Sequence, residues 1–414
     1  MDRAQRGEVL PLNILYLCHR IPFPPNKGDK IRSFNQIRLL ARNHNVHLAC
    51  MIDDPEDRQY VAELEKYCAS VDVAFRGSAS QKLHALGSLP GKRPLSVAIF
   101  HCSELQKKVD QRLESASIDA VFVFSSAMAE YVMHRDDLPR LMDFVDVDSE
   151  KFRAYASHQR FPMSWIYRIE ADRLRRYEQH VSETFQASLL VSESEARLFK
   201  ERTGTPGDVL PNGVDLEYYS PIRPGTRSDP PALVFTAVMD YLPNVDAMKF
   251  FCREIFPHIQ AEMPETKMFI VGRNPTKEVE ALATDQVVVT GSVPDVRPYL
   301  EQAWVAVAPF KIARGVQNKV LEAMAVGLPV VGTSLAFQGI PAREQDGVRC
   351  ADKPERFAQE VLELLKDRAL LDREGQSARA YVENKHGWDE HGAQLERLLD
   401  EFSRRPEPAL TPVS

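Results

Sequence analysis

The sequence predicts an α/β protein built from two doubly wound domains in series. Its 414 residues suffice for two domains of ordinary size. Short runs rich in Val, Ile and Leu alternate with longer amphipathic stretches, which is the pattern of a parallel sheet covered by helices on both faces. The pattern restarts after a polar, Pro-rich break at residues 225–231. Two such domains that face each other would form a deep cleft, and ligands of these sheets bind beyond the carboxyl ends of the strands.

Each predicted strand is a buried apolar run, and each predicted helix is an amphipathic stretch between two runs. In the first domain, strands are expected at residues 13–18, 45–52, 71–76, 119–124, 140–146 and 187–192. Helices are expected there at residues 30–42, 56–68, 103–115 and 164–185. In the second domain, strands are expected at residues 232–238, 266–272, 286–291, 304–309 and 328–333. The domains then cover residues 12–224 and 230–386, and the Pro-rich tail at 404–414 is expected to be disordered.

Composition narrows the classes of function. The net charge of −7 does not favour a general nucleic-acid binder. Six scattered cysteines without a C-x-x-C pair argue against a zinc site and a disulfide framework, and they fit a reducing cytoplasm. Without a long apolar run or a signal-type segment, we expect a cytoplasmic protein that could touch the inner membrane face. No G-x-G-x-x-G or Walker A motif follows a strand, which disfavours an NAD dehydrogenase or a P-loop NTPase.

The segment CHRIPFPPNKGDKIRSFNQIRLL follows the first strand and leads into a helix. Gly28 would let the backbone approach a ligand closely, and the free N–H groups at the helix start could bind an anion. Lys27, Lys30 and Arg32 add positive charge there. The alternative is an ordinary strand-to-helix turn.

Polar side chains follow two later strands of the first domain. Asp143, Asp146 and Asp148 surround a strand end in DFVDVDSEKF and could bind sugar hydroxyls, hold a divalent metal, or cap the next helix through Asp148 or Ser149. We favour capping over a substrate role, and a substrate role over a metal.

The preceding strand ends at Ser125 and Ser126. Their hydroxyls could cap a helix or contact a ligand.

Residues 151–180 carry seven Lys or Arg side chains against three acidic ones, with Phe161, Trp165, Ile166 and Tyr167 among them. A basic segment with aromatic residues can lie on an anionic membrane surface. The alternative is a solvated helix face whose aromatic residues belong to the core.

Two strand ends of the second domain carry groups suited to a nucleotide. In VGRNP, Arg273 could pair with a phosphate. In TGSVPDVRPYL, a loop at Gly291, Ser292 and Val293 could offer backbone groups to the edge of a base. Asp295 in that loop could equally cap the helix that follows.

The stretch ARGVQNKVLEAMAVGLPVVGT, residues 313–333, predicts a loop and a helix that ends near Val326. A helix start with Lys319 and Arg314 beside it suits a diphosphate. The loop and first turn comprise Gly315, Val316, Gln317 and Asn318.

Glu322 lies one turn further into the same helix, among apolar neighbours. It could occupy a surface position on an amphipathic helix. Because a buried carboxylate without a partner is costly, we favour a ligand partner such as a ribose diol.

These segments resemble family-4 retaining glycosyltransferases, which have the GT-B fold of two Rossmann-like domains. The resemblance spans about residues 12–403 and is carried by LPNGVD (210–215), TGSVPDVRPYLEQAWVAVAPF (290–310), NKVLEAMAVGLPVVGT (318–333) and HGWDEHGAQLERLL (386–399). Within this family, the chain is most similar to the sugar transferases of PEP-CTERM/exosortase exopolysaccharide systems. The segments that carry this similarity are PFPPNKGDKIRSFNQIRLL, DFVDVDSEKF and GVQNKVLEAMA.

The resemblance implies metal-independent transfer of a sugar, with retention, from a UDP- or GDP-linked donor to a glycan or lipid-linked glycan in exopolysaccharide or cell-envelope synthesis. No cofactor is implied. The last helix, 387–403, would pack back on the first domain. Glu322 matches the family's ribose-binding glutamate. Gly315 and the amides of Val316 to Lys319 match the segment that faces the diphosphate and the donor sugar. Gly291 to Pro294 match the base-binding loop, and Gly28 matches a glycine near the donor phosphate.

This chain departs from the family pattern at several positions. Arg314 stands where the family has a glutamate that contacts the donor sugar, so the sugar must be bound differently. Asn244 and Lys249 replace the usual Arg…Lys pair, and we expect Arg273 and Lys319 to supply charge to the leaving diphosphate.

The family's first-domain histidine has no clear counterpart, since Ser125 and Ser126 occupy a similar strand end. Asp146 is then the candidate for an acceptor or donor-sugar contact, and Lys319, Arg273 and Asp146 are the predicted catalytic residues. A nucleotide-sugar epimerase and a non-catalytic binding module are the alternatives to a transferase.

Overall fold

The computed structural model describes residues 11–25, 27–75, 91–223, 225–313 and 315–403, and these form two compact units. Unit 1 runs to Pro211 and resumes at His391, and unit 2 covers Asn212–Glu390. The boundary expected between residues 224 and 230 lies inside unit 2. The tail at 404–414, predicted to be disordered, and Arg314 lie outside the described residues.

Unit 1 is built on a seven-stranded parallel sheet of order β3-β2-β1-β4-β5-β6-β7. Its strands are β1 (Asn13–Cys18), β2 (Asn45–Ile52), β3 (Ser70–Phe75), β4 (Ala120–Phe124), β5 (Arg140–Val145), β6 (Ala187–Leu190) and β7 (Asp208–Val209). The chain moves outward from β1 to β3 and then returns to the other side of β1. The order therefore reverses between β1 and β4, as in a doubly wound sheet.

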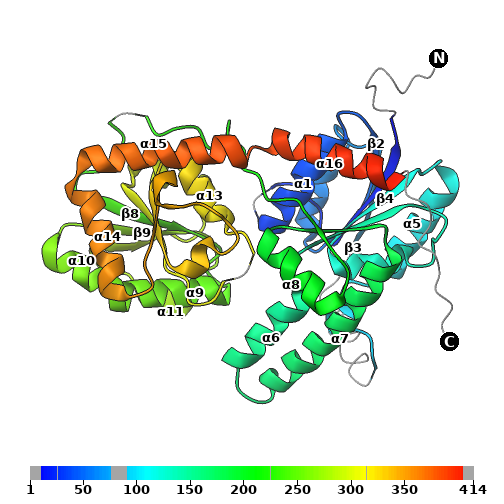
Figure 1. Ribbon diagram of the computed structural model, residues 1–414, viewed down its shortest axis with the longest axis horizontal. Coiled ribbons are helices and arrows are strands. Elements are labelled where there is room, and N and C mark those ends of the chain that lie inside the picture. The colour runs from blue at the N-terminus through cyan, green and yellow to red at the C-terminus, as the bar shows by residue number, and fades with distance from the viewer. Residues whose placement is uncertain (1–10, 26, 76–90, 224, 314, 404–414) are drawn as a thin grey trace. The chain divides into compact units, whose positions relative to one another are not determined.

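Helices cover both faces of this sheet (Figure 1). They are α1 (Gly28–Leu40), α2 (Val61–Leu64), α4 (Leu95–Ile99), α5 (Ser103–Ser115), α6 (Asp148–His158), α7 (Met163–Thr184), α8 (Glu193–Thr203) and α16 (Trp388–Ser403). Alternate β1 residues serve opposite cores because strand side chains alternate between faces. Tyr16 packs with Ile37 of α1 and Leu395 of α16, whereas Leu15 packs with Val109 of α5. The last helix is thus part of unit 1.

Unit 2 is built on a six-stranded parallel sheet of order β10-β9-β8-β11-β12-β13. Its strands are β8 (Ala232–Thr236), β9 (Lys267–Val271), β10 (Val287–Val289), β11 (Val305–Ala308), β12 (Val330–Gly332) and β13 (Val348–Cys350). The order reverses between β8 and β11.

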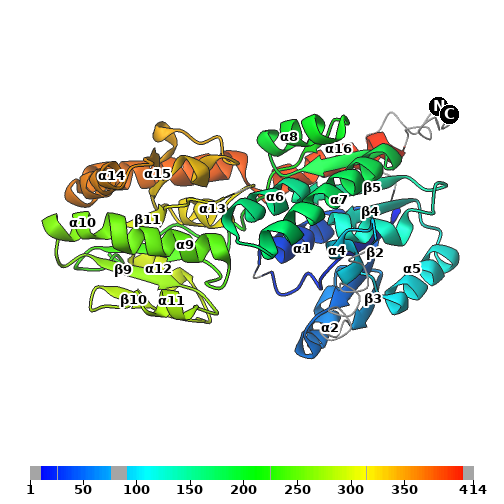
Figure 2. The same ribbon diagram turned by 90° about the horizontal axis from the view of Figure 1, so that it is seen from below.

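Helices lie on both faces of this sheet as well (Figure 2). They are α9 (Leu242–Phe250), α10 (Phe256–Glu262), α11 (Lys277–Glu280), α12 (Arg297–Gln302), α13 (Asn318–Ala325), α14 (Pro354–Lys366) and α15 (Arg368–Lys385). The predicted α/β class with two doubly wound sheets is confirmed.

Two local predictions differ from the structure. The helix expected at 56–68 is a 3₁₀ helix, Pro55–Tyr60, followed by the short α2. No residue of that 3₁₀ helix is buried, so no apolar face supports a longer helix. The edge strands β7 and β13 were not predicted, because two or three residues are too short for a strand pattern.

Candidate functional site

The carboxyl ends of β8 and β11 lie side by side where the strand order of unit 2 reverses. Helix α9 follows β8 and helix α13 follows β11, so their first turns rise from neighbouring strand ends. Lys319 of α13 donates from Nζ to Oδ1 of Asn244 of α9, at 2.9 Å. This contact marks the position where doubly wound sheets bind ligands.

The start of α13 has the geometry of an anion site. Gly315 takes the left-handed conformation with φ 64°, which favours glycine. Gln317 precedes the helix and makes no side-chain cap hydrogen bond. Asn318, the first helical residue, accepts at Oδ1 from Nδ2 of Asn212, at 2.8 Å. The N-cap residue therefore does not cap the first amides of the helix with its side chain, and a helix start of this kind can bind an anion.

Lys319 is a half-buried cation with no carboxylate partner among the ion pairs of the described residues. Its Nζ lies 4.7 Å from the ring centroid of Phe310 and 5.5 Å from that of Phe235. Burial lowers the pKa of Lys319 to about 8, although the charge of Glu322 opposes the shift. An anionic ligand would stabilise this ammonium.

Glu322 lies one turn after Lys319 on α13 and is also half-buried. Burial raises the pKa of its carboxyl, while the charge of Lys319 and a hydrogen bond with Tyr219 lower it. Burial and the nearby Glu322 carboxyl raise the pKa of Tyr219 well above its usual range. Glu322 is therefore partly buried next to Tyr219 and is not a fully exposed surface residue.

Two tyrosines missed by the sequence reasoning connect this site to the predicted base loop. Tyr218 donates its hydroxyl to Oδ1 of Asp295, at 3.2 Å, and the guanidinium of Arg297 lies 4.1 Å from its ring centroid. Its neighbour Tyr219 contacts Glu322. Both lie within four residues of the end of LPNGVD, and this motif was the signal in the sequence that could have found them.

The loop predicted to face a base consists of Gly291, Ser292 and Val293. Gly291 takes φ 68°, and a Cβ there would meet nothing within 4 Å. The turn conformation, rather than crowding, therefore favours glycine. Asp295 accepts from the amide of Arg297, the first residue of α12, at 2.9 Å, but Val296 is the N-cap residue, so the interpretation of Asp295 as the N-cap is wrong.

Arg273 follows β9 and supplies a second cation, which makes no ion pair with another described residue. A Cβ at the preceding Gly272, which has φ 151°, would lie 1.6 Å from the carbonyl oxygen of Ala237. Glycine thus lets the two strand ends approach, and the carbonyl of Arg273 accepts from the amide of Met239 at 2.9 Å. Nη2 of Arg273 is buried and has no hydrogen-bond partner within the described part of the chain.

The loop at residues 237–239 also contacts Asn244, the residue that accepts from Lys319. Nδ2 of Asn244 donates to the carbonyl of Val238 at 2.8 Å. Both ends of the Asn244 amide are thereby engaged inside the protein. Asn244 therefore positions Lys319, and its role as a contact to the nucleotide sugar stays a prediction. Lys249 pairs with Glu278 and does not supply charge to the site.

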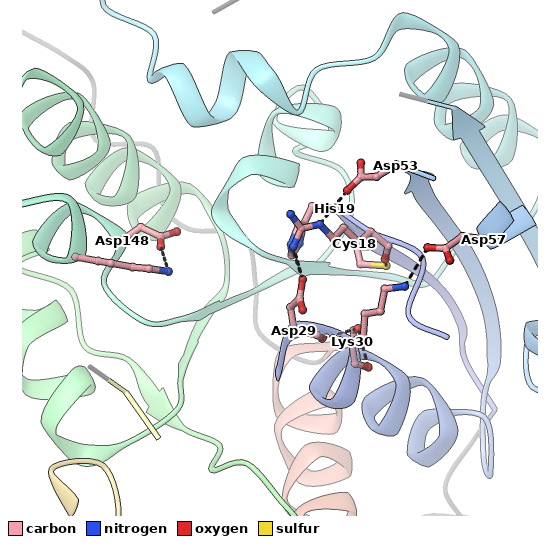
Figure 3. A network of polar contacts seen from close by, with 10 residues as sticks. Cys18, His19, Asp29, Lys30, Asp53, Asp57 and Asp148 are labelled. Atoms are coloured by element: carbon pink, nitrogen blue, oxygen red, sulfur yellow. Dashed lines mark hydrogen bonds and ion pairs between the residues drawn. The ribbon is translucent and has the colours of Figure 1, made fainter. Parts of the chain in front are cut away.

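Several charged residues predicted for unit 1 are satisfied inside the protein. Arg32 is bidentate to Asp143, with Nε 2.8 Å from Oδ2 and Nη2 3.1 Å from Oδ1. Gln36 donates to the same carboxylate at 2.6 Å. Lys30 pairs with Asp57 at 3.1 Å (Figure 3). The predictions that Arg32 and Lys30 attract an anion, and that Asp143 binds a ligand, are therefore wrong.

The start of α6 corrects the capping prediction for Asp148 and Ser149. Helix α6 begins at Asp148 after Val147, and no side chain at that position caps it. Carboxylates from other helices do this instead. Glu178 of α7 accepts from the Ser149 amide at 2.9 Å and from its hydroxyl at 2.5 Å, and Glu195 of α8 accepts from the Val147 amide at 2.9 Å.

Two strained residues lie at the ends of β4 and β5, next to the predicted acceptor-side residues. Ser125 has φ 76° and Val145 has φ 67°, which is unusual for a β-branched residue. Asp146 follows Val145, its Oδ1 is buried without a hydrogen-bond partner among the described residues, and burial raises its pKa. Ser126 donates to Oδ2 of Asp148 at 3.3 Å. Strain of this kind concentrates at functional sites.

His19 at the end of β1 is a further polar residue that the sequence reasoning did not select (Figure 3). Its Nε2 lies 3.3 Å from Oδ2 of Asp29, and its ring stacks on Phe124 with centroids 5.9 Å apart. Burial would raise the pKa of Asp29, but His19 and Arg20 outweigh it and hold that pKa well below its usual range. The start of α1 at Gly28 thus carries its own carboxylate, which competes with an external anion.

Within the described residues, no group of three His, Cys, Asp or Glu side chains is arranged to hold a metal ion. The described helices include none that is both long enough and apolar enough to cross a membrane.

Comparison with known proteins agrees with this architecture. Residues 230–367, which lie in unit 2, match the family model described as "Glycosyl transferases group 1". No curated protein matches the chain by sequence.

Solved structures match over nearly the whole chain. Sucrose-phosphate synthase from Thermosynechococcus elongatus has a TM-score of 0.71 at 15% identity, covering 94% of this chain and 98% of that chain. HepE from Anabaena, in complex with UDP and glucose, has a TM-score of 0.66 at 14% identity, covering 94% and 100%. WaaG, a glycosyltransferase involved in lipopolysaccharide biosynthesis, has a TM-score of 0.60 at 18% identity, covering 93% and 99%. The fold is that of GT-B glycosyltransferases, with two parallel-sheet, Rossmann-like domains.

Proposed function

We propose that this protein is a glycosyltransferase that moves a sugar from a nucleotide sugar to a glycan or lipid-linked glycan acceptor, with retention at the anomeric carbon and without a metal. The observation that carries the proposal is the polar set at the strand ends of unit 2. Lys319 and Arg273 are cations without carboxylate partners in the described chain, and both are held against the loop at residues 237–239. The match of residues 230–367 to a glycosyltransferase family supports the same conclusion.

The two cations and the first amides of α13 suit a diphosphate leaving group. In the transfer, the bond between the anomeric carbon and the diphosphate oxygen breaks, and a bond from the acceptor oxygen to that carbon forms. The leaving phosphate oxygen takes the acceptor proton, so no strong general base is required. Charges and amides that are already in place stabilise the negative charge as it develops.

Glu322 and the loop at Gly291 to Val293 would hold the nucleoside. Tyr219 is a hydrogen-bond partner of the Glu322 carboxyl, which could also accept hydrogen bonds from a ribose diol. The neighbour HepE was solved with UDP-glucose, which supports UDP as the first nucleotide to test, with GDP as the alternative.

Unit 1 would bind the acceptor at the ends of β4 and β5. Asp146, with its unpartnered Oδ1, and the strained Ser125 support this assignment. Ser126 is the weaker candidate because its hydroxyl already bonds Asp148. The structural neighbour WaaG is a glycosyltransferase involved in lipopolysaccharide biosynthesis. Together with the resemblance to exosortase-associated sugar transferases, this similarity supports a role in exopolysaccharide or envelope synthesis at the cytoplasmic face of the inner membrane.

Nucleotide release from a panel of UDP-, GDP- and ADP-sugars, measured with and without acceptor glycans, tests the proposal. A transferase releases nucleotide from one donor and transfers its sugar to an acceptor, and Glu322→Ala abolishes most of that release. Conversion of the donor without any acceptor would instead indicate an epimerase. No turnover of any donor, together with no nucleotide binding, would indicate a binding module and contradict the proposal.

A further inference from the structure

The turn between α6 and α7 exposes three large apolar side chains within five residues. Phe161 is 80% exposed, Trp165 is 56% exposed and Met163 is 39% exposed. The alternative that the aromatic residues of this segment all belong to the core is therefore wrong for Phe161 and Trp165. In Figure 1 this turn lies at the end of the α6–α7 hairpin that is farthest from the sheet of unit 1.

The hairpin itself is firmly built, so this exposure does not come from a loose helix. Rings of α6 pack against Tyr167 of α7, with the centroid of Phe152 at 5.9 Å and that of Tyr155 at 6.0 Å. The buried Glu170 of α7 accepts from the amides of Leu95 and Ser96 at 2.7 and 2.9 Å. The tip is thus held out on a rigid support.

Exposed arginines extend from the apolar tip along α7. Trp165, Arg168, Arg175 and Arg176 are all exposed and recur at helical spacing, so they share one face of α7. Arg160 is exposed beside Phe161. None of these four arginines makes an ion pair with another residue in the described part of the chain.

The exposed acidic residue on this face, Asp172, is already paired with Arg153 at 3.0 Å. The surface is therefore basic, although the chain as a whole carries a net charge of −7. We define the tip surface as Arg160, Phe161, Met163, Trp165, Arg168, Arg175 and Arg176.

We propose that the tip surface docks the protein on a lipid bilayer that contains anionic headgroups. Phe161, Met163 and Trp165 insert into the headgroup and acyl boundary, and the arginines contact lipid phosphates. Charge complementarity favours this occupant, because unpaired arginines around an apolar tip match a surface that is negative outside and apolar beneath. The inference does not depend on the proposed sugar transfer.

Co-sedimentation with vesicles tests the docking. The full chain should bind vesicles of phosphatidylcholine with 30% phosphatidylglycerol and should bind pure phosphatidylcholine vesicles far more weakly. Binding should weaken as the salt concentration rises. Equal binding to both vesicle types, or binding that salt does not change, would overturn the proposal.

Two variants separate the apolar and charged contributions. F161S/W165S should lose at least tenfold in partitioning to the anionic vesicles. R168Q/R175Q should lose about fivefold per arginine, because a basic residue near an anionic surface contributes an attraction of that order. The matched controls are Y241S/L242S and R253Q in unit 2, which also change exposed side chains and should leave partitioning unchanged. Equal losses in the controls would contradict the assignment to the tip surface.

Insertion has its own optical signal. Vesicles with brominated acyl chains should quench the fluorescence of the wild-type protein, and Trp165→Phe should remove the quenching while Trp304 and Trp388 still report. Quenching that persists in Trp165→Phe would contradict insertion of the tip.

If vesicles do not bind and F161S/W165S converts a dimer to a monomer, the tip surface is an interface between two copies and the proposal fails. All these residues are exposed, so the thermal midpoint should not change.

Discussion

Two cations in this molecule, the buried Arg32 and the half-buried Lys319, have opposite environments. In unit 1, Arg32 is 1% exposed and donates to Asp143, which is 0% exposed, and to the carbonyl of Leu210 at 2.8 Å. In unit 2, the half-buried Lys319 has an amide oxygen and two aromatic rings as neighbours but no carboxylate pair. A buried charge is costly to leave unpaired. Arg32 is therefore a structural residue, and we propose that an anionic ligand completes the environment of Lys319.

The same contrast applies to the carboxylates beside the two cations. Asp143 accepts from Arg32, Gln36 and the amide of Val145, which fills most of its hydrogen-bonding capacity. Glu322 has a hydrogen bond with Tyr219, and burial raises the pKa of its carboxyl. A polar group that is satisfied within the protein contributes to a unique fold, whereas one that is left short of partners is available to a ligand.

The largest expected effect is on stability, from Arg32→Met. Removal of Arg32 leaves Asp143 buried without its countercharge, so the free energy of unfolding should fall by about 3–5 kcal/mol. Denaturant unfolding of the wild type and the variant measures this. R32M/D143L should recover part of the loss, and Arg135→Ala, which breaks an exposed pair with Asp137, should cost at most about 1 kcal/mol. A loss below about 1 kcal/mol for Arg32→Met would contradict the claim that the pair of Arg32 with Asp143 stabilises the fold.

Lys319→Met should affect binding instead of stability. Affinity for UDP should fall roughly 100-fold, because the diphosphate loses a buried cation. The free energy of unfolding should stay constant or rise by about 1 kcal/mol, since an unpaired buried charge disappears. Calorimetric titration with UDP and denaturant unfolding check the two arms. Lys249→Met, which removes a lysine outside the site, should change neither by more than a small factor.

The pH dependence of UDP binding should follow Lys319. Burial lowers the pKa of this lysine to about 8, and the diphosphate binds the ammonium form. Affinity should therefore fall about tenfold between pH 7 and pH 9. In the free protein the sign is opposite, because loss of the proton from a group with a lowered pKa favours folding between about pH 8 and the usual lysine pKa of 10.5. A Lys319→Met protein whose affinity still falls over this range would contradict the assignment.

The smallest expected effect is on the recognition of ribose by Glu322. The wild-type protein should prefer UDP to 2′-deoxy-UDP by roughly tenfold, because a hydrogen bond to a charged group contributes about 1.5 kcal/mol. Glu322→Gln should lose most of that preference, while its thermal midpoint stays the same or rises. Competition binding with the two nucleotides measures it. An unchanged preference would place the ribose elsewhere.

Strand positions could be predicted from the sequence because each strand is a continuous apolar run. β1, β2 and α5 have the predicted bounds, and α13 ends next to Val326 as expected. Lys319 and Glu322 could also be selected as candidate site residues from the sequence, because a charged residue among apolar neighbours in a short helix is a local pattern.

Pairings across the chain could not be predicted. Arg32 and Asp143 are 111 residues apart, and Ser149 and Glu178 lie on different helices. Their separate local patterns resemble an anion site, a sugar contact and a helix cap. Tyr219 and His19 were missed for the same reason, because each gains its meaning from a neighbour that the fold supplies.

A crystal structure of the protein with UDP would test the central claim most directly. We expect the diphosphate within ion-pair distance of Nζ of Lys319 and the guanidinium of Arg273, and the ribose at the carboxylate of Glu322. A nucleotide bound away from these three side chains, or at the start of α1 beside Gly28 alone, would contradict the account.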